Sequence, residues 1–321
     1  MQLPNTLADR FEVIRKLGES ARSTTVLADD AEHGRLVLRL WPGSDSRIAP
    51  RAGAISQVMH PALPELYAFG EDTTAGITWV AQERVRGLNL AELRMALARP
   101  FTPQEAATLL TPIADALQRA HAAGITHERL SLRQITVTLA PWGVRPMLLG
   151  LAPPLSDPEP GSAVFHPPRV SGASTDVCAL AALAYWLTSG SGPSGNLWNW
   201  DRPRAPELAD VSWAASLGFW LAPGSGIRMD DVLETLAGYP EPKMGPIHEL
   251  LELEQQARLP SQLGGTIPIK WVPGEELPEL EEEEGRPEPG SGRYVFHIGL
   301  GMASGLVAMV GGLIALVSLL R

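Results

Sequence analysis

The first part of the chain alternates short apolar runs with turn residues, which is the pattern of β-strands. The runs are five to seven residues long, contain Val, Leu, Ile, Thr and Trp, and are bounded by Gly, Asp and Ser. Residues of these types favour a pleated, half-buried surface. The pattern therefore predicts five strands, at residues 11–17, 24–28, 36–41, 65–69 and 78–82.

Beyond Gly87 the apolar residues recur at helical spacing. Thr102 is followed three residues later by Glu105, and this is the pattern of a capping box at the start of a helix. The expected helices cover residues 90–98, 102–123 and 176–189, with a small hairpin at residues 135–139 and 144–149. Strands followed mostly by helices, with a hinge at residues 83–87, predict a two-lobed α+β domain.

Between this domain and the final apolar run, the sequence predicts a helix, an extended piece and a linker. Residues 246–258 have the spacing of an amphipathic helix, and residues 265–272 indicate a short extended piece. Eight glutamates then stand between Glu275 and Glu288, among prolines and glycines. Such a run repels itself and buries little surface, so it indicates an extended linker. A docking tail for a basic partner and a partner-binding helix are the alternatives.

The run from Ile298 to Leu320 contains 23 residues and no charge. As a helix it would reach about 34 Å, which is enough to cross the hydrocarbon core of a bilayer. The N-terminal residues lack the apolar region of a signal peptide. We therefore expect a single-pass anchor in the cytoplasmic (inner) membrane, with the domain in the cytoplasm. Small residues on one helical face predict dimerisation of this span through Gly301, Gly305, Ala308 and Gly312.

Composition narrows the function classes. The 321 residues carry a net charge of −10, which argues against general nucleic-acid binding. One cysteine, Cys178, excludes an internal disulfide framework and a multi-cysteine zinc site. The lysines are Lys16, Lys243 and Lys270, so no lysine stands between the first two.

Eight landmarks carry a resemblance that covers residues 11–236. They are LGESARSTTVLA at 17–28, LVLRL at 36–40, His60-Pro61, AQERVRGLNL at 81–90, GITHERLSLRQI at 124–135, LLGLAPP at 148–154, STDVCALAALAYWLTSG at 174–190, and Arg228. In this order they resemble eight features of a bacterial Ser/Thr protein kinase domain. These are the Gly-rich loop, the ATP-binding strand, the His-Pro pair after the first helix, the hinge, the catalytic loop, the metal-binding turn, the central buried helix and the arginine near the domain end. The resemblance implies a small β-rich N-lobe and a larger helical C-lobe.

The same resemblance places other residues where phosphoryl transfer needs its chemical groups. Arg129 stands at the catalytic aspartate and cannot accept a proton, and Gly150 stands at the magnesium-binding aspartate. The remaining substituted positions are Ser131 for a lysine, Gln134 for the metal-binding asparagine, Arg39 for the ATP-binding lysine and Arg51 for its glutamate partner. Two arginines would give like charges instead of an ion pair. The resemblance therefore implies a degenerate domain, a pseudokinase.

The Gly-rich loop is also altered. Gly18 remains, whereas Ser20 and Ser23 stand at the other two glycine positions, where side chains restrict the approach of phosphates. Lys16 is the one lysine within the fold that could take over the lost charge. Asp157 is the nearest downstream carboxylate, and we expect it to be a solvated loop residue.

Several matched residues have packing or turn roles rather than chemical ones. We expect such roles for His127, Leu130, Ile135, Gly124, Asp176 and Gly190. Arg228 would ordinarily pair with a glutamate that is Pro168 here, so we expect it to be exposed. For Trp186, Trp198, Trp200, Trp213 and Trp220, core packing is the favoured interpretation and an exposed aromatic patch the alternative.

The expected function is a membrane-anchored pseudokinase that binds a protein partner as a scaffold or regulator, without a metal or a required cofactor. One alternative is a nucleotide-sensing regulator that binds ATP weakly, without magnesium, at Gly18, Arg39 and Glu83; another is a divergent kinase with residual activity. The expected divisions are 1–10 as a lead-in, 11–86 as the N-lobe, 87–240 as the C-lobe, 241–273 as an extension, 274–294 as the linker and 295–321 as the transmembrane helix.

Overall fold

A computed structural model describes most of the predicted domain. The described residues are 3–20, 22–151, 165, 170–189, 208, 210–221, 226–240, 242 and 244–262. Residues 1–254 form one unit, and of the second unit, 255–321, the description covers 255–262. None of the helices in the described ranges is long and apolar enough to cross a membrane. Several predictions fall outside the described residues. They concern the extended piece, the acidic linker, the span from Ile298 to Leu320, and the residues Asp157, Pro168, Gly190, Trp198 and Trp200.

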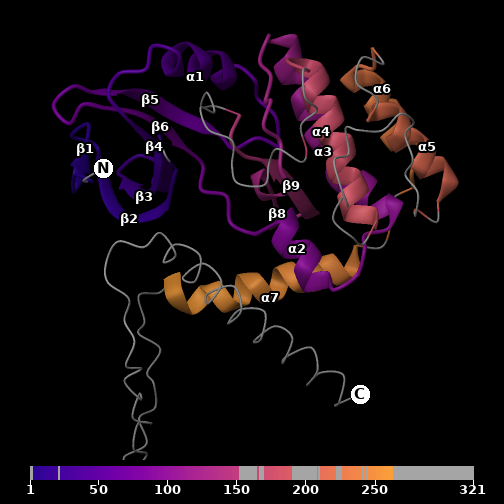
Figure 1. The fold of residues 1–321 in the computed structure, drawn as a ribbon. Helices are drawn as coiled ribbons and strands as arrows, with labels where there is room; N and C mark the ends of the chain where they lie inside the picture. The colour runs from indigo at the N-terminus through magenta and orange to yellow at the C-terminus, as the bar shows by residue number, and fades with distance from the viewer. Residues whose placement is uncertain are drawn as a thin grey trace, which may run out of the picture. The chain divides into compact units, whose positions relative to one another are not determined.

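The N-lobe is built on an antiparallel sheet of six described strands in the order β1-β2-β3-β4-β6-β5 (Figure 1). The strands are β1 (Thr6–Leu7), β2 (Phe11–Glu19), β3 (Thr24–Asp30), β4 (Gly34–Pro42), β5 (Leu66–Asp72) and β6 (Ile77–Gln82). All five predicted strands are present, and β1 is an addition that pairs with the start of β2. Alternate residues of β4 point into a core in which the rings of Phe11 and Trp79 meet edge to face at 5.0 Å.

One helix, α1 (Ile48–Ser56), lies against β5 in the N-lobe (Figure 1). Its buried residues Ile48, Ala52 and Ile55 are spaced four and three apart, which gives one apolar face. The hydrophobic pattern did not predict this helix, although the resemblance implied one before His60-Pro61.

The C-lobe begins at a short sheet in the order β7-β8-β9 and continues mainly as helices. Its elements are β7 (Leu88–Asn89), α2 (Leu90–Leu97), α3 (Pro103–Ala122), a 3-10 turn at Leu132–Gln134, β8 (Ile135–Ala140), β9 (Gly143–Leu148), α4 (Ala173–Ser189), α5 (Val211–Trp220), α6 (Met229–Ala237) and α7 (Gly245–Gln262). The predicted capping box is confirmed, because Thr102 accepts from the Glu105 N–H while Glu105 accepts from the Thr102 N–H. α3 packs on α4 and α6 (Figure 1).

The centre of the C-lobe is α4, which is buried on nearly every side. A helix that is apolar all round belongs in a core, as predicted for this segment. Trp213 of α5 is fully buried beside it, donates its indole N–H to Thr188 at 3.0 Å, and meets Trp220 and Tyr239 edge to face. Core packing is thus the role of Trp213 and Trp220.

The predicted hinge ends at Gly87, where two backbones approach closely. Gly87 has φ +154°, and a Cβ atom built there would stand 2.1 Å from the carbonyl oxygen of Val137 in β8. No side chain fits in that space, so glycine is required where the chain passes from the N-lobe to β7.

Candidate functional site

The loop between β2 and β3 is a tight hairpin closed by its own hydroxyl groups. Glu19 pairs with Thr24, and the Ser20 N–H donates to the Ser23 carbonyl at 2.8 Å. The two serine hydroxyls are 2.9 Å apart. Gly18 has a negative φ and open space where a Cβ would stand, so its position does not require glycine. This loop therefore lacks the steric signature of a backbone that must approach a ligand closely.

Arg39, which the resemblance aligns with the ATP-binding lysine, interacts with this hairpin. Its Nε donates to the Ser23 hydroxyl at 3.3 Å, and its guanidinium lies 5.6 Å from the ring centre of Trp41. Lys16, the candidate for a migrated lysine, forms an ion pair with Glu19 on the exposed surface of the hairpin. Both cations thus have partners within the N-lobe itself.

Arg51 of α1 reaches into the C-lobe. Its Nε donates to the carbonyl of Leu151 at 3.1 Å, and its Nη2 donates to the carbonyl of Thr126. Burial lowers the pKa of Arg51, and the charges of Glu128 and Asp176 oppose that shift. Arg39 and Arg51 thus donate hydrogen bonds to different partners.

The catalytic-loop segment is fixed by the fully buried carboxylate of Asp176. Asp176 accepts hydrogen bonds from the backbone N–H groups of His127 at 2.8 Å and Glu128 at 2.6 Å, and lies 2.8 Å from Nε2 of His121. Glu128 has φ +60°, a left-handed conformation that is costly for a non-glycine residue. Asp176 therefore holds a strained turn in place, which is the structural role predicted for it.

Two of the positions that the resemblance marks as substituted, Gly150 and Gln134, lie together next to this turn. Gly150 has φ +84°, and a Cβ atom there would lie 3.5 Å from Nε2 of Gln134 and 3.6 Å from Nε2 of His127. The Gln134 backbone carbonyl accepts from the Leu149 N–H at 2.7 Å, while its buried side-chain oxygen accepts no hydrogen bond from a described residue. Arg129 follows on the same loop, and its N–H lies 3.3 Å from Nδ1 of His127. Ser131 is buried at the start of the 3-10 turn.

These residues do not fit the magnesium ion that phosphoryl transfer uses. Magnesium is held mainly by carboxylate oxygens, whereas Gly150 has no side chain and Gln134 offers an amide. The two described acids beside this turn are already engaged: Asp176 as above, and Glu128 by accepting from the Thr126 hydroxyl at 3.1 Å and the Gly172 N–H at 3.0 Å. Their oxygens stabilise backbone turns.

The hinge residue Glu83 is bound within the N-lobe. Its N–H donates to the Glu65 carbonyl at 2.8 Å, and its carboxylate accepts from the Glu65 N–H at 3.2 Å. Arg145 of β9 approaches the same carboxylate at 3.9 Å. Two of the three residues expected at a nucleotide site, Arg39 and Glu83, thus interact with other residues of the protein.

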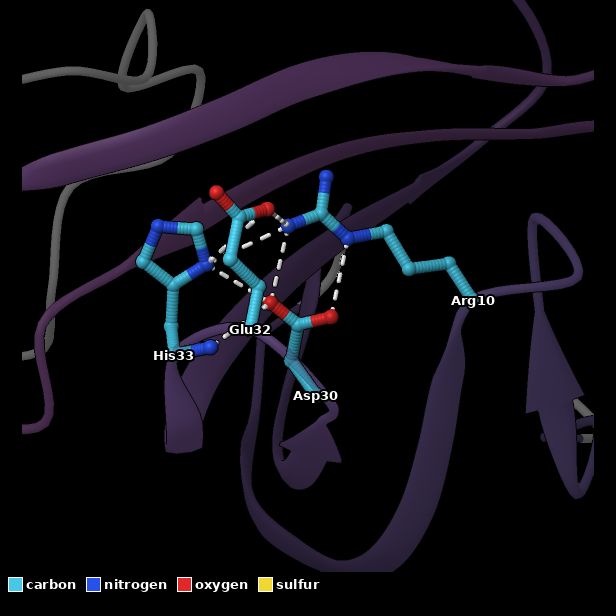
Figure 2. A network of polar contacts seen from close by, with 4 residues as sticks. All are labelled: Arg10, Asp30, Glu32 and His33. Atoms are coloured by element: carbon cyan, nitrogen blue, oxygen red, sulfur yellow. Dashed lines mark hydrogen bonds and ion pairs between the residues drawn. The ribbon is translucent and has the colours of Figure 1, made fainter.

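One cluster with metal-ligand chemistry occurs among the described residues, at the β3–β4 turn, and the sequence analysis did not single it out. Asp30, Glu32 and His33 bring their ligand atoms within 4.8 Å of one another. Figure 2 shows that the guanidinium of Arg10 lies among them, donating to both oxygens of Asp30 at 2.9 and 2.8 Å and to Glu32 at 3.0 Å. Arg10 supplies the cation of this cluster and holds the pKa of Asp30 well below its usual value.

The other predicted structural residues occupy the expected environments. His127, Leu130 and Ile135 are buried, and Gly124 has φ +72° at the turn after α3. Arg228 is exposed, as expected, with 75% of its side chain accessible.

The fold matches solved protein kinase domains. The kinase domain of PknI from Mycobacterium tuberculosis superimposes with a TM-score of 0.57 at 20% identity, covering 73% of this chain and 98% of that domain. A point mutant of the same domain gives the same TM-score at 23% identity, covering 74% of this chain and 100% of that domain. This is a protein kinase-like fold.

Sequence similarity links the kinase-like domain to bacterial relatives. The probable serine/threonine-protein kinase PknB of Corynebacterium glutamicum is 28% identical over 211 residues, covering 58% of this chain and 32% of the relative. A probable serine/threonine-protein kinase of Corynebacterium efficiens is 29% identical over 214 residues, with the same coverage. The chain thus spans about a third of the length of these relatives. No protein-family model matches the chain.

Proposed function

We propose that this chain is a pseudokinase, a regulator that binds a protein partner through a kinase-like domain without transferring phosphate. The observation that carries the proposal is that the two described acids beside the catalytic loop are engaged in structural hydrogen bonds. Asp176 and Glu128 accept hydrogen bonds from four different groups of the surrounding backbone and side chains. These hydrogen bonds support a structural role for both carboxylates.

Elementary chemistry supports the same conclusion at the substituted positions. A guanidinium stays protonated at all accessible pH values, so Arg129 cannot orient a substrate hydroxyl as a base does. Arg39 already donates to Ser23, and Gly150 offers no oxygen for a metal. Transfer of a phosphoryl group needs these roles together.

Magnesium dependence of ATP binding is a direct test of this proposal. The purified chain is melted with ATP alone and with ATP plus magnesium, and Asp157→Asn serves as a variant that removes the nearest downstream carboxylate. We expect the two wild-type curves to coincide. A magnesium-dependent rise of several degrees would contradict the proposal, and its loss in Asp157→Asn would identify the ligand.

A nucleotide-sensing regulator is the second candidate, and Gln134 favours it. Its buried side-chain oxygen accepts no hydrogen bond from a described residue, and a buried acceptor is stabilised when it gains a donor. An amino or hydroxyl group of a nucleotide could supply one. An ATP-dependent melting shift that needs no magnesium and disappears in Gln134→Leu would support this candidate. The names of the relatives favour a third, a kinase with residual activity.

Membrane attachment and dimerisation complete the proposal. The uncharged run from Ile298 to Leu320 would hold the domain at the inner face of the cytoplasmic membrane, and its small-residue stripe would pair two copies. A reporter of transmembrane association distinguishes pairing from plain anchoring. We expect a weaker signal from Gly305→Ile than from the native span, and equal signals would contradict pairing.

A further inference from the structure

Arg51 occupies an unusual place for a charged residue. It stands three residues after Ile48 and four before Ile55, on the inward side of α1. A charge on the buried side of a helix is costly unless hydrogen bonds and an opposite charge compensate for it. The hydrogen bonds and nearby opposite charges of Arg51 therefore offset the cost of burying its guanidinium.

Those partners all belong to the C-lobe. Leu151 and Thr126, whose carbonyls accept from Arg51, are 100 and 75 residues away in sequence. Leu151 follows β9 and Thr126 lies in the catalytic-loop segment, so a single guanidinium joins α1 to two separate segments. We propose that Arg51 is a clasp that ties the N-lobe helix to the C-lobe through two backbone carbonyls. This inference goes beyond the proposed function and does not depend on it.

The charge of the clasp is balanced from the C-lobe side. Glu128 and Asp176 both interact electrostatically with Arg51. Glu128 also accepts from the hydroxyl of Thr126, the residue whose carbonyl receives the Arg51 Nη2. Through Glu128 the same network reaches the N–H of Gly172, just before α4. Arg51 thus connects α1, the catalytic loop and the entrance to α4.

A second set of contacts joins the two lobes without Arg51. The Leu148 N–H donates to the Ala62 carbonyl at 2.7 Å, and Nε2 of His60 lies 2.8 Å from Asp115 of α3. These contacts come from the segment between α1 and β5, and they do not involve Arg51. Loss of the clasp should therefore loosen α1 and its partner segments while the domain stays folded.

Hydrogen exchange of the full chain, measured by mass spectrometry, tests the clasp. Arg51→Gln removes the charge and the two-pronged donor, and Arg47→Gln is the matched control because Arg47 lies at the start of the same helix with 63% of its side chain exposed. Hydrogen bonds from a charged group are strong enough that their loss predicts about tenfold or faster exchange in α1 and at residues 148–151. We expect wild-type exchange in Arg47→Gln and unchanged protection of α3 and α4 in both variants.

Arg51→Lys keeps the test decisive if Arg51→Gln does not fold. A lysine retains the charge opposite Glu128 and Asp176, but its single ammonium lacks the fork that reaches both carbonyls. We expect faster exchange in the same two segments with a cooperative melt. Wild-type exchange there in the folded Arg51 variants, or an equal rise across α3 and α4, would overturn the clasp. Protection of these segments by Mg·ATP in the wild type would contradict the proposed function and leave the Arg51 comparison intact.

Discussion

Replacing Asp176 with asparagine should destabilise the domain more than any equivalent change on its surface. The carboxylate is fully buried and accepts two backbone hydrogen bonds, at 2.8 and 2.6 Å, in addition to its contact with His121. An amide keeps one acceptor oxygen and turns an NH2 group toward the other donor. Hydrogen bonds to a charged group contribute about 1.5–3 kcal/mol each, so we expect a loss of about 3 kcal/mol in the free energy of unfolding.

The loss should appear as a lower melting temperature. For a domain of this size 1 kcal/mol corresponds to about 2–4 °C, so Asp176→Asn should melt about 6–12 °C below the wild type by circular dichroism. The matched control is Asp115→Asn on α3, which also lies 2.8 Å from a histidine but is 37% exposed. Exposed ion pairs contribute about 0–1 kcal/mol, and the control should stay within about 3 °C. Equal shifts in the two variants would refute the role given to Asp176.

Two further predictions concern the backbone and the acid limit of stability. Gly87→Ala should lower the free energy of unfolding by more than about 2 kcal/mol, because its Cβ would stand 2.1 Å from the Val137 carbonyl oxygen. The control is Gly76→Ala, where a Cβ meets open space, and equal urea midpoints for the two variants would contradict the prediction. Arg10→Met should lower stability at neutral pH and flatten its decline below about pH 4, the ordinary pKa of an aspartate. Arg10 lowers the pKa of Asp30 in the folded state, so the ionised Asp30 contributes stability above that pH. This contribution is lost as the pH falls through the folded pKa of Asp30. If the stabilities of the wild type and Arg10→Met fell in parallel from pH 7 to pH 2, this prediction would be contradicted.

The sequence predicted those elements whose signals are local. The five strands, the capping box at Thr102 and the buried helix α4 all follow from spacing within a few residues. The helices α1, α5 and α6 were missed from periodicity. α1 and α6 are each only 9 residues long, which gives a periodic pattern few repeats, and α5 is apolar with little sidedness.

At the candidate site, too, the sequence indicated features of local motifs but not contacts between distant residues. The resemblance implied that residues 129, 134 and 150 differ from those of an active kinase, and it also implied a structural role for Asp176. The partners of Arg51 were not, because Thr126 and Leu151 are 75 and 100 residues away and contribute backbone carbonyls, which leave no sequence signature. Likewise, nothing local to Glu128 indicates that it binds Gly172.

Transfer of labelled phosphate from ATP is the measurement that tests the central claim most directly. The purified full chain is incubated with ATP and magnesium or manganese, with and without a generic protein substrate, beside the Arg39→Ala variant. The account predicts that neither the chain nor the substrate gains label above the level of the variant. Label that depends on the divalent ion and disappears in Arg39→Ala would show that this kinase-like domain is an active kinase.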